Sequence, residues 1–515
     1  MGQIIAFVLY FVLMLGIGIF FFLKSGGNGE KEYFLGGRAM GPWVTAMSAQ
    51  ASDMSGWLLM GFPGSILAFG MGKVWIGIGL ALGTIANWLI VARRLRRFSK
   101  AAGDAITLPQ YLTNRFATAH PLLKVVCAVI FLISFTVYVA SAFNAGTAVF
   151  VSVLPWFADH QMLAMVIFAV LILCYTFLGG YRAVCWTDFF QGILMLVALL
   201  AVPIVMASTG RFDATYNEAF TEGITAFGSN PFTEDITDIV SGLGWGLGYF
   251  GMPHILVRFM SIRKSSMVKT GASVAIVWIV LALGATIAVA ILGRTYLLSS
   301  GESLAATLLP GNQKLVFVEI AKDIFPPVIA GVMLSAIIAA AMSTADSQLL
   351  VASSSFTSDI YKPLMRKGKA SDKEVMWVGR IVVALVSVVA FLIASSGLDN
   401  PDSWSADIMN MVENAWGLFG SAFGPVVILS LFWKRLNYSG AVAGIVAGAV
   451  MDIAWLLCFT NTVTDALVTN TNIYEIVPGF VVGMLVCVVV TLCTKKPSAE
   501  VDAIFNMATD KSIDD

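Results

Sequence analysis

The sequence predicts an all-α polytopic membrane protein with about 13 transmembrane helices. Hydrophobic residues make up 58% of its 515 residues and charged residues only 12%, whereas a soluble domain is about 25% charged. Runs of about 20 mainly apolar residues, the length that spans a bilayer, recur along the whole chain. Two of these runs are interrupted by polar or glycine-rich sequence, which is typical of membrane helices that line a buried site.

The apolar runs follow one another without a linker or a soluble domain. The first run, residues 3–23, is long enough to span and is not followed by a small-residue cleavage pattern, so we expect a membrane span rather than a cleaved signal peptide. The later runs are centred near residues 57, 82, 137, 169, 197, 248, 282, 340, 386, 420, 448 and 483. We therefore expect a single domain over residues 1–515, whose last two spans cover about 438–494 and whose cytoplasmic tail covers 495–515.

The positions of the basic residues predict an N-terminus outside and a C-terminus inside. When the chain is threaded in this way, 26 of its 31 Lys and Arg residues lie on the inner side and 5 on the outer side. Cytoplasmic loops of membrane proteins carry such an excess of Lys and Arg. The orientation is therefore N-out and C-in.

The second span carries a carboxylate at membrane depth. Asp53 lies between Ser52, Ser55 and Gly56 in an apolar stretch. An ionised carboxylate in hydrocarbon costs at least ~2.5–3.5 kcal/mol. We interpret Asp53 as part of a buried ion or substrate site, and the alternative is a carboxylate that only holds neighbouring helices together.

The seventh span is a poor helix former. From Ser241 to His254 it reads S-G-L-G-W-G-L-G-Y-F-G-M-P-H, and glycine and proline cost ~1 and ~3 kcal/mol in a helix interior. Helix packing through glycine is the alternative, but glycines at every second residue do not share one helix face. A broken helix exposes carbonyl groups that bind cations and N–H groups that bind carboxylates.

The two interrupted spans are five apart in the series. Because five is odd, the blocks of five helices that they open enter the membrane from opposite sides. This is the arrangement of an inverted repeat, with repeat one at about 43–208 and repeat two at about 237–432.

The ninth span carries a stripe of small oxygen-bearing residues. Ala340, Ser343, Thr344 and Ser347 follow the i, i+3, i+4, i+7 spacing of one helix face. Their oxygens suit a hard cation such as Na+, although hydroxyls in membrane helices also bond to their own turn. Asp346 projects roughly 110° away from the stripe, which argues against its being a direct ligand of the same ion.

The junction between the fifth and sixth spans contains a turn and another acid. Gly179, Gly180 and Arg182 predict a tight cytoplasmic turn, and Asp188 opens the sixth span. A carboxylate at a helix N-terminus caps the helix, so capping and an ion-related role remain alternatives. The six cysteines lack metal-like spacing, and we interpret them as packing residues.

Together these segments resemble the sodium:solute symporter family. The resemblance covers essentially the whole chain and is carried by F-L-G-G-R (34–38), A-S-D-M-S-G-W-L-L-M-G (51–61), W-G-L-G-Y-F-G-M-P-H-I-L (245–256), M-S-T-A-D-S-Q-L-L (342–350) and S-L-F-W-K-R-L-N-Y-S-G-A-V-A-G-I-V-A-G (430–448). It implies a LeuT-like transporter domain of two inverted five-helix repeats, spans 2–6 and 7–11. Spans 1, 12 and 13 would be peripheral.

The resemblance also implies a site. The Na+ ligands would be the carbonyls of Ala51, Met54 and Ala340 and the hydroxyls of Ser343 and Thr344, with Asp53 in support. The substrate pocket would be formed by Ser55, Gly56, Trp57, Tyr138, Trp245, Tyr249, Met252 and Pro253, and accessory roles would fall to Asp188, Asp346 and Arg38. Met252 stands where glutamine is usual, and Asp346 stands where some members carry a small residue; these departures bear on selectivity and ion coupling.

The activity that the resemblance implies is Na+-coupled import of L-proline by alternating access, in the bacterial inner (plasma) membrane. A symporter for another small amino acid or a monocarboxylate is the alternative. A membrane enzyme is a distant one, because the sequence offers no His/Glu/Cys constellation or nucleotide-binding loop. The expected partners are L-proline, Na+ and the lipid bilayer, without nucleic acid or an obligate protein partner.

Overall fold

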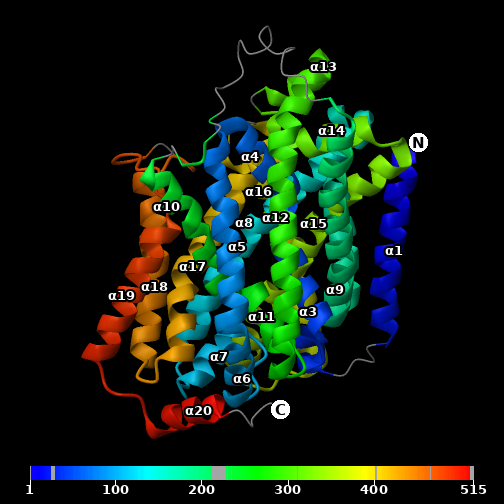
Figure 1. Cartoon of the computed structure of the whole chain (residues 1–515). Coiled ribbons are helices and arrows are strands. Elements are labelled where there is room, and N and C mark those ends of the chain that lie inside the picture. The colour runs from blue at the N-terminus through cyan, green and yellow to red at the C-terminus, as the bar shows by residue number, and fades with distance from the viewer. Residues whose placement is uncertain are drawn as a thin grey trace.

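The protein is a bundle of long helices that run side by side (Figure 1). The computed structural model describes residues 2–24, 29–211, 228, 230–232, 235–309, 311–400, 403–463 and 466–510. Within these residues ten helices are long and apolar enough to cross a membrane. Their backbone hydrogen bonds are satisfied within each helix, which is what a hydrocarbon environment demands. The only β-type pairing in this part of the chain is a single bridge between Met40 and Ile262.

The helices of the first half are α1 (Gly2–Lys24), α2 (Glu30–Leu35), α3 (Pro42–Asp53), α4 (Phe62–Phe69), α5 (Val74–Ala86), α6 (Arg93–Ala101), α7 (Leu108–Arg115), α8 (Leu122–Val153) and α9 (Gln161–Ser208). Those of the second half are α10 (Ile236–Gly244), α11 (Pro253–Ser261), α12 (Val268–Ser299), α13 (Glu302–Ala305), α14 (Val316–Ile324), α15 (Pro327–Ser354), α16 (Asp372–Asp399), α17 (Ile408–Phe432), α18 (Tyr438–Phe459), α19 (Ile476–Cys493) and α20 (Ala499–Thr509). The π-helical segments η2 (Trp57–Gly61), η4 (Asn87–Ala92) and η11 (Ser355–Met365) and the 3₁₀ segment η7 (Trp245–Phe250) lie between them. Shorter 3₁₀ turns are η1 (Gly36–Arg38), η3 (Met71–Lys73), η5 (Pro155–Asp159), η8 (Ser265–Met267), η9 (Ala306–Leu308), η10 (Gln313–Leu315) and η12 (Trp404–Ala406).

The predicted break in the second span is confirmed. Helix α3 ends at Asp53, because Met54 adopts φ −87° and ψ 80°, outside the helical region. The chain resumes as η2 and then α4, which has Pro63 in its first turn. Gly56 lies in the break, where a Cβ atom would come within 2.4 Å of the Cβ of Ala145 on α8. Only glycine therefore allows α8 to approach the break this closely.

The predicted break in the seventh span is confirmed as well. Helix α10 passes into the tighter 3₁₀ coil of η7, and Met252 (φ −74°, ψ 107°) separates η7 from α11. The glycines of this segment do not lie on one helix face. Instead, their missing side chains leave space for groups of the neighbouring helix. A Cβ at Gly248 would lie 1.9 Å from Nε1 of Trp416, and one at Gly251 would lie 2.2 Å from the Phe419 carbonyl oxygen. Helix α17 thus packs directly on the interrupted backbone.

The predicted turn at Gly179–Gly180 is also confirmed. Gly180 has φ 57° and ψ −177°, so α9 consists of two helical stretches that meet there. Gly180 lies against Tyr33. Gln161, at the start of α9, lines a cavity together with Lys322 of α14, and Arg211, just after its end, pairs with Asp323 of α14. Both ends of α9 therefore lie on the α14 side, and the chain reverses at Gly180.

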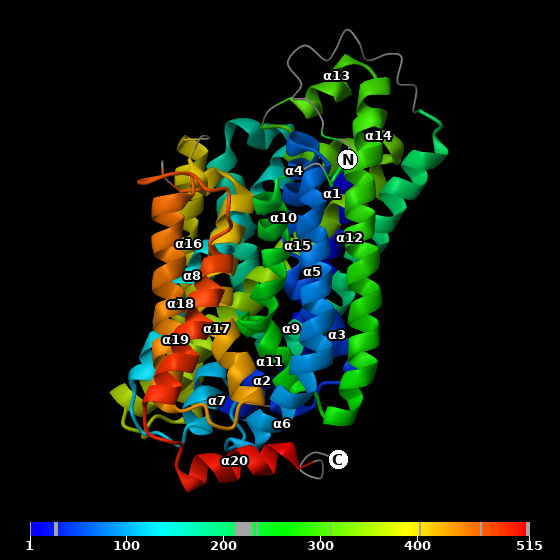
Figure 2. The ribbon, with the colours of Figure 1, turned by 60° about the vertical axis from the view of Figure 1, so that its left-hand side comes forward.

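Helix α15 occupies the centre of the bundle and packs against α1, α3, α8 and α9 (Figures 1 and 2). Every residue from Met333 to Ser354 is buried. A helix that is surrounded on all sides is expected to be apolar all round, so the hydroxyls and the carboxylate that α15 carries need a specific reason. The first and last described residues lie at opposite ends of the bundle, with α20 lying across the end that bears the C-terminus.

Candidate functional site

The hydroxyl stripe on α15 faces the end of α3. Ser343 Oγ lies 2.8 Å from the carbonyl oxygen of Ala51 and 3.2 Å from that of Ala340. Three of the five predicted Na+ ligands therefore already meet, although Ala51 and Ser343 are almost 300 residues apart in sequence. All three residues are fully buried. The cluster joins the broken second span to the central helix.

The two remaining predicted ligands lie beside this cluster. The hydroxyl oxygen of Thr344 is buried and has no hydrogen-bond partner within the described residues, although membrane-helix threonines commonly bond to their own turn. Met54 is the first non-helical residue after α3, so its carbonyl is released from the helix pattern. Carbonyl and hydroxyl oxygens are the donors that hard cations prefer. The residues present therefore fit a Na+ ion.

Asp53 links the two broken spans. Its Oδ2 accepts a hydrogen bond of 2.6 Å from the Tyr249 hydroxyl of η7, and its main-chain carbonyl accepts from Trp57 Nε1 at 3.3 Å and from the Tyr138 hydroxyl at 3.4 Å. Its Oδ1 is buried without a partner in the described residues. Asp53 thus stabilises the interrupted backbone of the second span through hydrogen bonds and is not part of the Ser343 cluster.

Aromatic rings surround the same region. The ring centroids of Trp57 and Trp245 are 6.3 Å apart, and those of Tyr249 and Trp416 are 5.0 Å apart at 83°. Ser55 Oγ accepts from the backbone N–H of Trp57 at 3.5 Å. The structure therefore brings six predicted substrate residues around Asp53: Ser55, Gly56, Trp57, Tyr138, Trp245 and Tyr249. The other two, Met252 and Pro253, lie at the far end of η7, where α11 begins.

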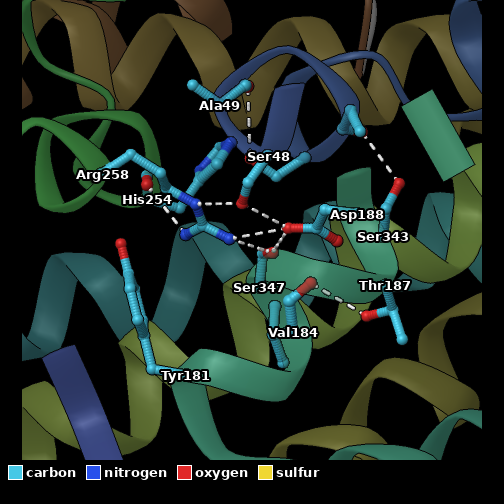
Figure 3. A network of polar contacts seen from close by, with 12 residues as sticks. Ser48, Ala49, Tyr181, Val184, Thr187, Asp188, His254, Arg258, Ser343 and Ser347 are labelled. Carbon is cyan, nitrogen blue, oxygen red and sulfur yellow. Dashed lines mark hydrogen bonds and ion pairs between the residues drawn. The ribbon is translucent and has the colours of Figure 1, made fainter. Parts of the chain in front are cut away.

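A charged network lies on the α11 side of the Ser343 cluster (Figure 3). Asp188 Oδ2 accepts from Ser48 Oγ at 2.6 Å and pairs with Arg258 Nη2 at 3.2 Å. Arg258 also donates to Ser48 Oγ at 3.2 Å and to the hydroxyl of Ser347. Four separate helices, α3, α9, α11 and α15, contribute to it. Breaking a buried ion pair by removing one partner typically costs about 3–5 kcal/mol, so this network helps to fix the four helices.

The capping role considered for Asp188 is wrong. The second stretch of α9 begins just after Gly180, so Asp188 lies two turns inside the helix, where its side chain meets Arg258 instead of free N–H groups. Asp346 is buried on α15 and acts electrostatically on Arg258. Arg38 lies away from the site: it pairs with Asp104 at 2.7 Å and donates to the carbonyls of Met260 and Ala105 at 2.5 and 2.7 Å.

Three residues of the site were missed by sequence reasoning. Trp416 donates from Nε1 to the Trp245 carbonyl at 2.8 Å, and Asn87 donates to the Tyr249 carbonyl at 2.9 Å. Each of them donates to a main-chain carbonyl of η7. The sequence predicts that the broken helix leaves carbonyls without a partner, but it does not identify the side chains that bind them. Arg258 had a signal of its own, since a charged residue within a span needs a buried partner.

Comparison with known proteins gives consistent results. A model of the sodium:solute symporter family matches residues 33–448. The sodium/proline symporter of Haemophilus influenzae is 40% identical over 515 residues, covering 98% of this chain and 97% of that protein. The osmoregulated proline transporter OpuE of Bacillus subtilis is 40% identical over 502 residues, covering 96% and 95%. A sodium/proline symporter of Staphylococcus aureus is 39% identical over 514 residues, covering 98% and 95%.

Solved structures share the fold. The substrate-bound, outward-open state of a Na+-coupled sialic acid symporter superimposes with a TM-score of 0.73 at 20% identity, over 97% of this chain and 99% of that chain. The nucleobase-cation-symport-1 family transporter MHP1, in a closed conformation, gives a TM-score of 0.55 at 15% identity, over 94% and 99%. At these identities the likeness shows the fold alone, the LeuT-like helical arrangement that the family resemblance implied.

Proposed function

The chain belongs to the sodium:solute symporter family, and from this premise we propose that it imports L-proline together with Na+. Full-length relatives at 39–40% identity that are named sodium/proline symporters support the substrate. Membership of the sodium:solute symporter family supports Na+ as the coupling ion. Bacterial relatives and the membrane-spanning helices support a location in the bacterial plasma membrane.

The observation that carries the proposal is the contact between α15 and α3. The hydroxyl of Ser343 lies 2.8 Å from the Ala51 carbonyl, next to the unpartnered hydroxyl of Thr344. A Na+ ion bound by these oxygens and by the carbonyls of Met54 and Ala340 would tie the broken span to the central helix. Release of the ion would weaken the connection between α3 and α15, so the ion would influence whether the break holds its substrate-binding shape.

The proposed substrate site lies on the other side of the break. The rings of Trp57, Trp245 and Tyr249 would contact the saturated ring of proline. N–H groups of the interrupted backbone near Ser55 and Gly56 would bind its carboxylate. Asp53, through Tyr249, would couple the ion site to this pocket, because its hydrogen bond connects the two interruptions.

We further propose that the chain crosses the membrane thirteen times, N-out and C-in, as two inverted repeats. The opposite positions of the first and last described residues support an odd number of crossings. To the ten helices of spanning length, this count adds the segments α3–α4 and α10–α11 and the first stretch of α9. The excess of Lys and Arg on one side supports the orientation.

The test is uptake by the purified protein in liposomes. With an inward Na+ gradient, radiolabelled L-proline should accumulate inside above its external concentration; with K+ in place of Na+, or after an ionophore collapses the gradient, it should only equilibrate. Protein-free liposomes are the control. Na+-driven uptake of another small amino acid or a monocarboxylate, without uptake of proline, would replace the substrate and keep the ion site. Equal proline uptake with and without the Na+ gradient would overturn the coupling.

A further inference from the structure

A groove runs along the outside of the bundle between α3, the second stretch of α9 and α12. These three helices pack against one another, and Figures 1 and 2 show α3 beside the end of α12 that lies nearer to the C-terminus. The groove has a volume of about 670 Å³, within the ~300–1,000 Å³ range of small-molecule pockets. None of its lining residues belongs to the proposed Na+ or substrate site, so it needs an explanation of its own.

The lining of the groove changes from polar to apolar along α12. The polar lining residues come from the first two turns of the helix and the apolar ones from the turns that follow: Lys269, Thr270 and Ser273, then Val274, Val277 and Trp278. At 1.5 Å per residue, this series covers roughly 13 Å of the helix. An amphiphilic molecule, polar at one end and apolar along the rest, matches this order.

The apolar part of the groove is open to the membrane. On α9 the side chains of Ile193 and Val197 are 42% and 51% exposed, and on α12 that of Val277 is 59% exposed. The floor is the buried ring of Trp278, whose Nε1 donates to the Gly192 carbonyl at 3.1 Å. Because this bond satisfies the indole N–H, the floor offers an apolar surface in a fixed position. Such a surface suits the acyl chain of a lipid.

The polar part of the groove lies at the end of the bundle that bears the C-terminus. The bridge between Met40 and Ile262 joins the chain just before α3 to the chain before α12. Arg96 of α6, a helix that packs against α20, donates to the Ile262 carbonyl. Trp43 and Lys269 are both exposed at this end. Tryptophan rings are enriched at the headgroup level of a membrane, so this end of the groove lies where lipid headgroups are found.

This end of the groove is also positively charged. Lys269 lines it, and Arg263 and Lys264 are exposed in the segment just before α12. Among the described residues that line the groove, none is Asp or Glu. Basic pockets between membrane helices on the cytoplasmic side bind the headgroups of anionic lipids. The proposed C-in orientation places this end of the groove on the cytoplasmic side.

We propose that the groove is a binding site for an anionic phospholipid of the cytoplasmic leaflet. The lipid phosphate would bind Lys269 and the hydroxyls of Thr270 and Ser273, and an acyl chain would lie on Trp278 between α9 and α12. Because Trp43 lies in the first turn of α3, the lipid would also join α12 to the helix that carries the first break. The site does not depend on which solute the protein transports.

Quenching of tryptophan fluorescence by brominated lipids tests this site on the full-length protein in phosphatidylcholine nanodiscs. Phosphatidylglycerol with brominated acyl chains, titrated at constant total lipid, should quench part of the emission in a saturable way, because Trp43 and Trp278 line the groove. Brominated phosphatidylcholine should quench only in proportion to its amount. The comparison between the two lipids separates binding of the anionic headgroup from general contact with the bilayer.

Variants at one exposed position assign the headgroup contact. Lys269→Gln should raise the mole fraction of phosphatidylglycerol needed for half-maximal quenching about fivefold, the usual effect of one basic residue on binding to anionic lipid. Lys269→Glu, which reverses the charge, should abolish the saturable part. Lys373→Gln removes another exposed lysine, outside the groove; it is the matched control and should be quenched as the wild type is.

Three results would overturn the proposal. Equal saturable quenching by both lipids would show that the groove holds any phospholipid without selecting its charge. Wild-type quenching by phosphatidylglycerol in both Lys269→Gln and Lys269→Glu would show that the headgroup is not bound at this end of the groove. Absence of saturable quenching by either lipid would show that the groove is not a lipid site and would leave it to another protein chain.

Discussion

Ser343 and Thr344 are adjacent hydroxyl side chains on α15 with different surroundings. Ser343 contacts carbonyls of two helices, whereas Thr344 has no partner in the described residues. A Na+ ion would give both oxygens the same role. The 3.6-residue periodicity of the sequence was enough to predict this stripe, because one helix fixes which residues share a face.

Replacing either hydroxyl should weaken Na+ activation of transport. In Ser343→Ala and Thr344→Ala the Na+ concentration for half-maximal uptake should rise about ten- to a hundredfold, because a bond to a charged group is worth roughly 1.5–3 kcal/mol. Ser335→Ala is the matched control: Ser335 is buried on the same helix and bonds only to its own turn, at 2.8 Å. Normal Na+ activation in both test variants would remove α15 from the ion site.

Asp53 should be required for coupling. Asp53→Asn keeps the side-chain shape but loses the charge that accepts the 2.6 Å bond from Tyr249, so Na+-driven uptake should be lost while the protein still inserts. Tyr249→Phe should retain uptake with an affinity for proline weakened about tenfold, since it loses one charge-assisted hydrogen bond. Ser52→Ala serves as the control, because Ser52 bonds to its own turn. Normal transport by Asp53→Asn would show that the carboxylate only holds helices together.

Long-range partners could not be predicted from the sequence. The pairing of Arg258 with Asp188 joins residues 70 positions apart, and nothing in either segment specifies the other. The same holds for Trp416, whose indole meets the Trp245 carbonyl across 171 positions. Local composition predicts that a buried charge or a carbonyl released from a helix needs a partner. Which residue is that partner depends on how the helices pack in three dimensions.

At the scale of helices, composition predicted the two interruptions correctly. Proline and glycine weaken a helix locally, so their effect is visible within one segment. The reason for each glycine lies in another segment, as with Gly248, which makes room for Trp416. The reversal at Gly180 was also visible locally, because glycine readily adopts the positive φ of that turn.

Filling the space at Gly248 should disable the protein. In Gly248→Ala the new Cβ would lie 1.9 Å from Trp416 Nε1, so the indole must move and lose its bond to the Trp245 carbonyl. Overpacking of this kind typically costs about 1–3 kcal/mol, and proline binding should fall with thermal stability. Gly284→Ala on α12 is the control, because nothing lies within 4 Å of its Cβ position. Wild-type binding and stability in Gly248→Ala would contradict the proposed packing of α17 on η7.

A cluster around Asp104 should make stability depend on pH. Partial burial acts to raise the pKa of the Asp104 carboxyl, but its hydrogen bond with Lys31 and the charge of Arg38 outweigh burial and hold the pKa below its usual range. The contribution of Asp104 to the free energy of unfolding is therefore complete above the ordinary carboxyl pKa of about 3.9. It is lost as the pH falls through the lower pKa of the folded state.

The variant that tests this is Asp104→Asn, because asparagine also tolerates the positive φ of this position. At neutral pH the variant should unfold at a lower temperature than the wild type, by an amount that corresponds to about 1 kcal/mol or less, since Asp104 is partly exposed. The difference should narrow as pH falls below about 4. A difference that is independent of pH would indicate altered packing instead of lost charge.

At the scale of the whole molecule, the proposed ion site and the proposed substrate site meet at one break in one helix. The contact of Ser343 with Ala51 and the bond of Asp53 to Tyr249 involve residues of α3 that are only two positions apart. In the proposed function, ion binding on one side would therefore shape the pocket on the other. Two ligands coupled in this way must raise each other's affinity by the same factor.

The most direct test of the account is the linkage between Na+ and proline binding, measured at equilibrium on purified protein without any gradient. The affinity for L-proline should rise at least about tenfold when Na+ replaces choline at constant ionic strength, and proline should raise the affinity for Na+ by the same factor. Ser343→Ala should reduce both effects together. Equal proline affinity in Na+ and in choline would contradict the claim that Na+ shapes the substrate site.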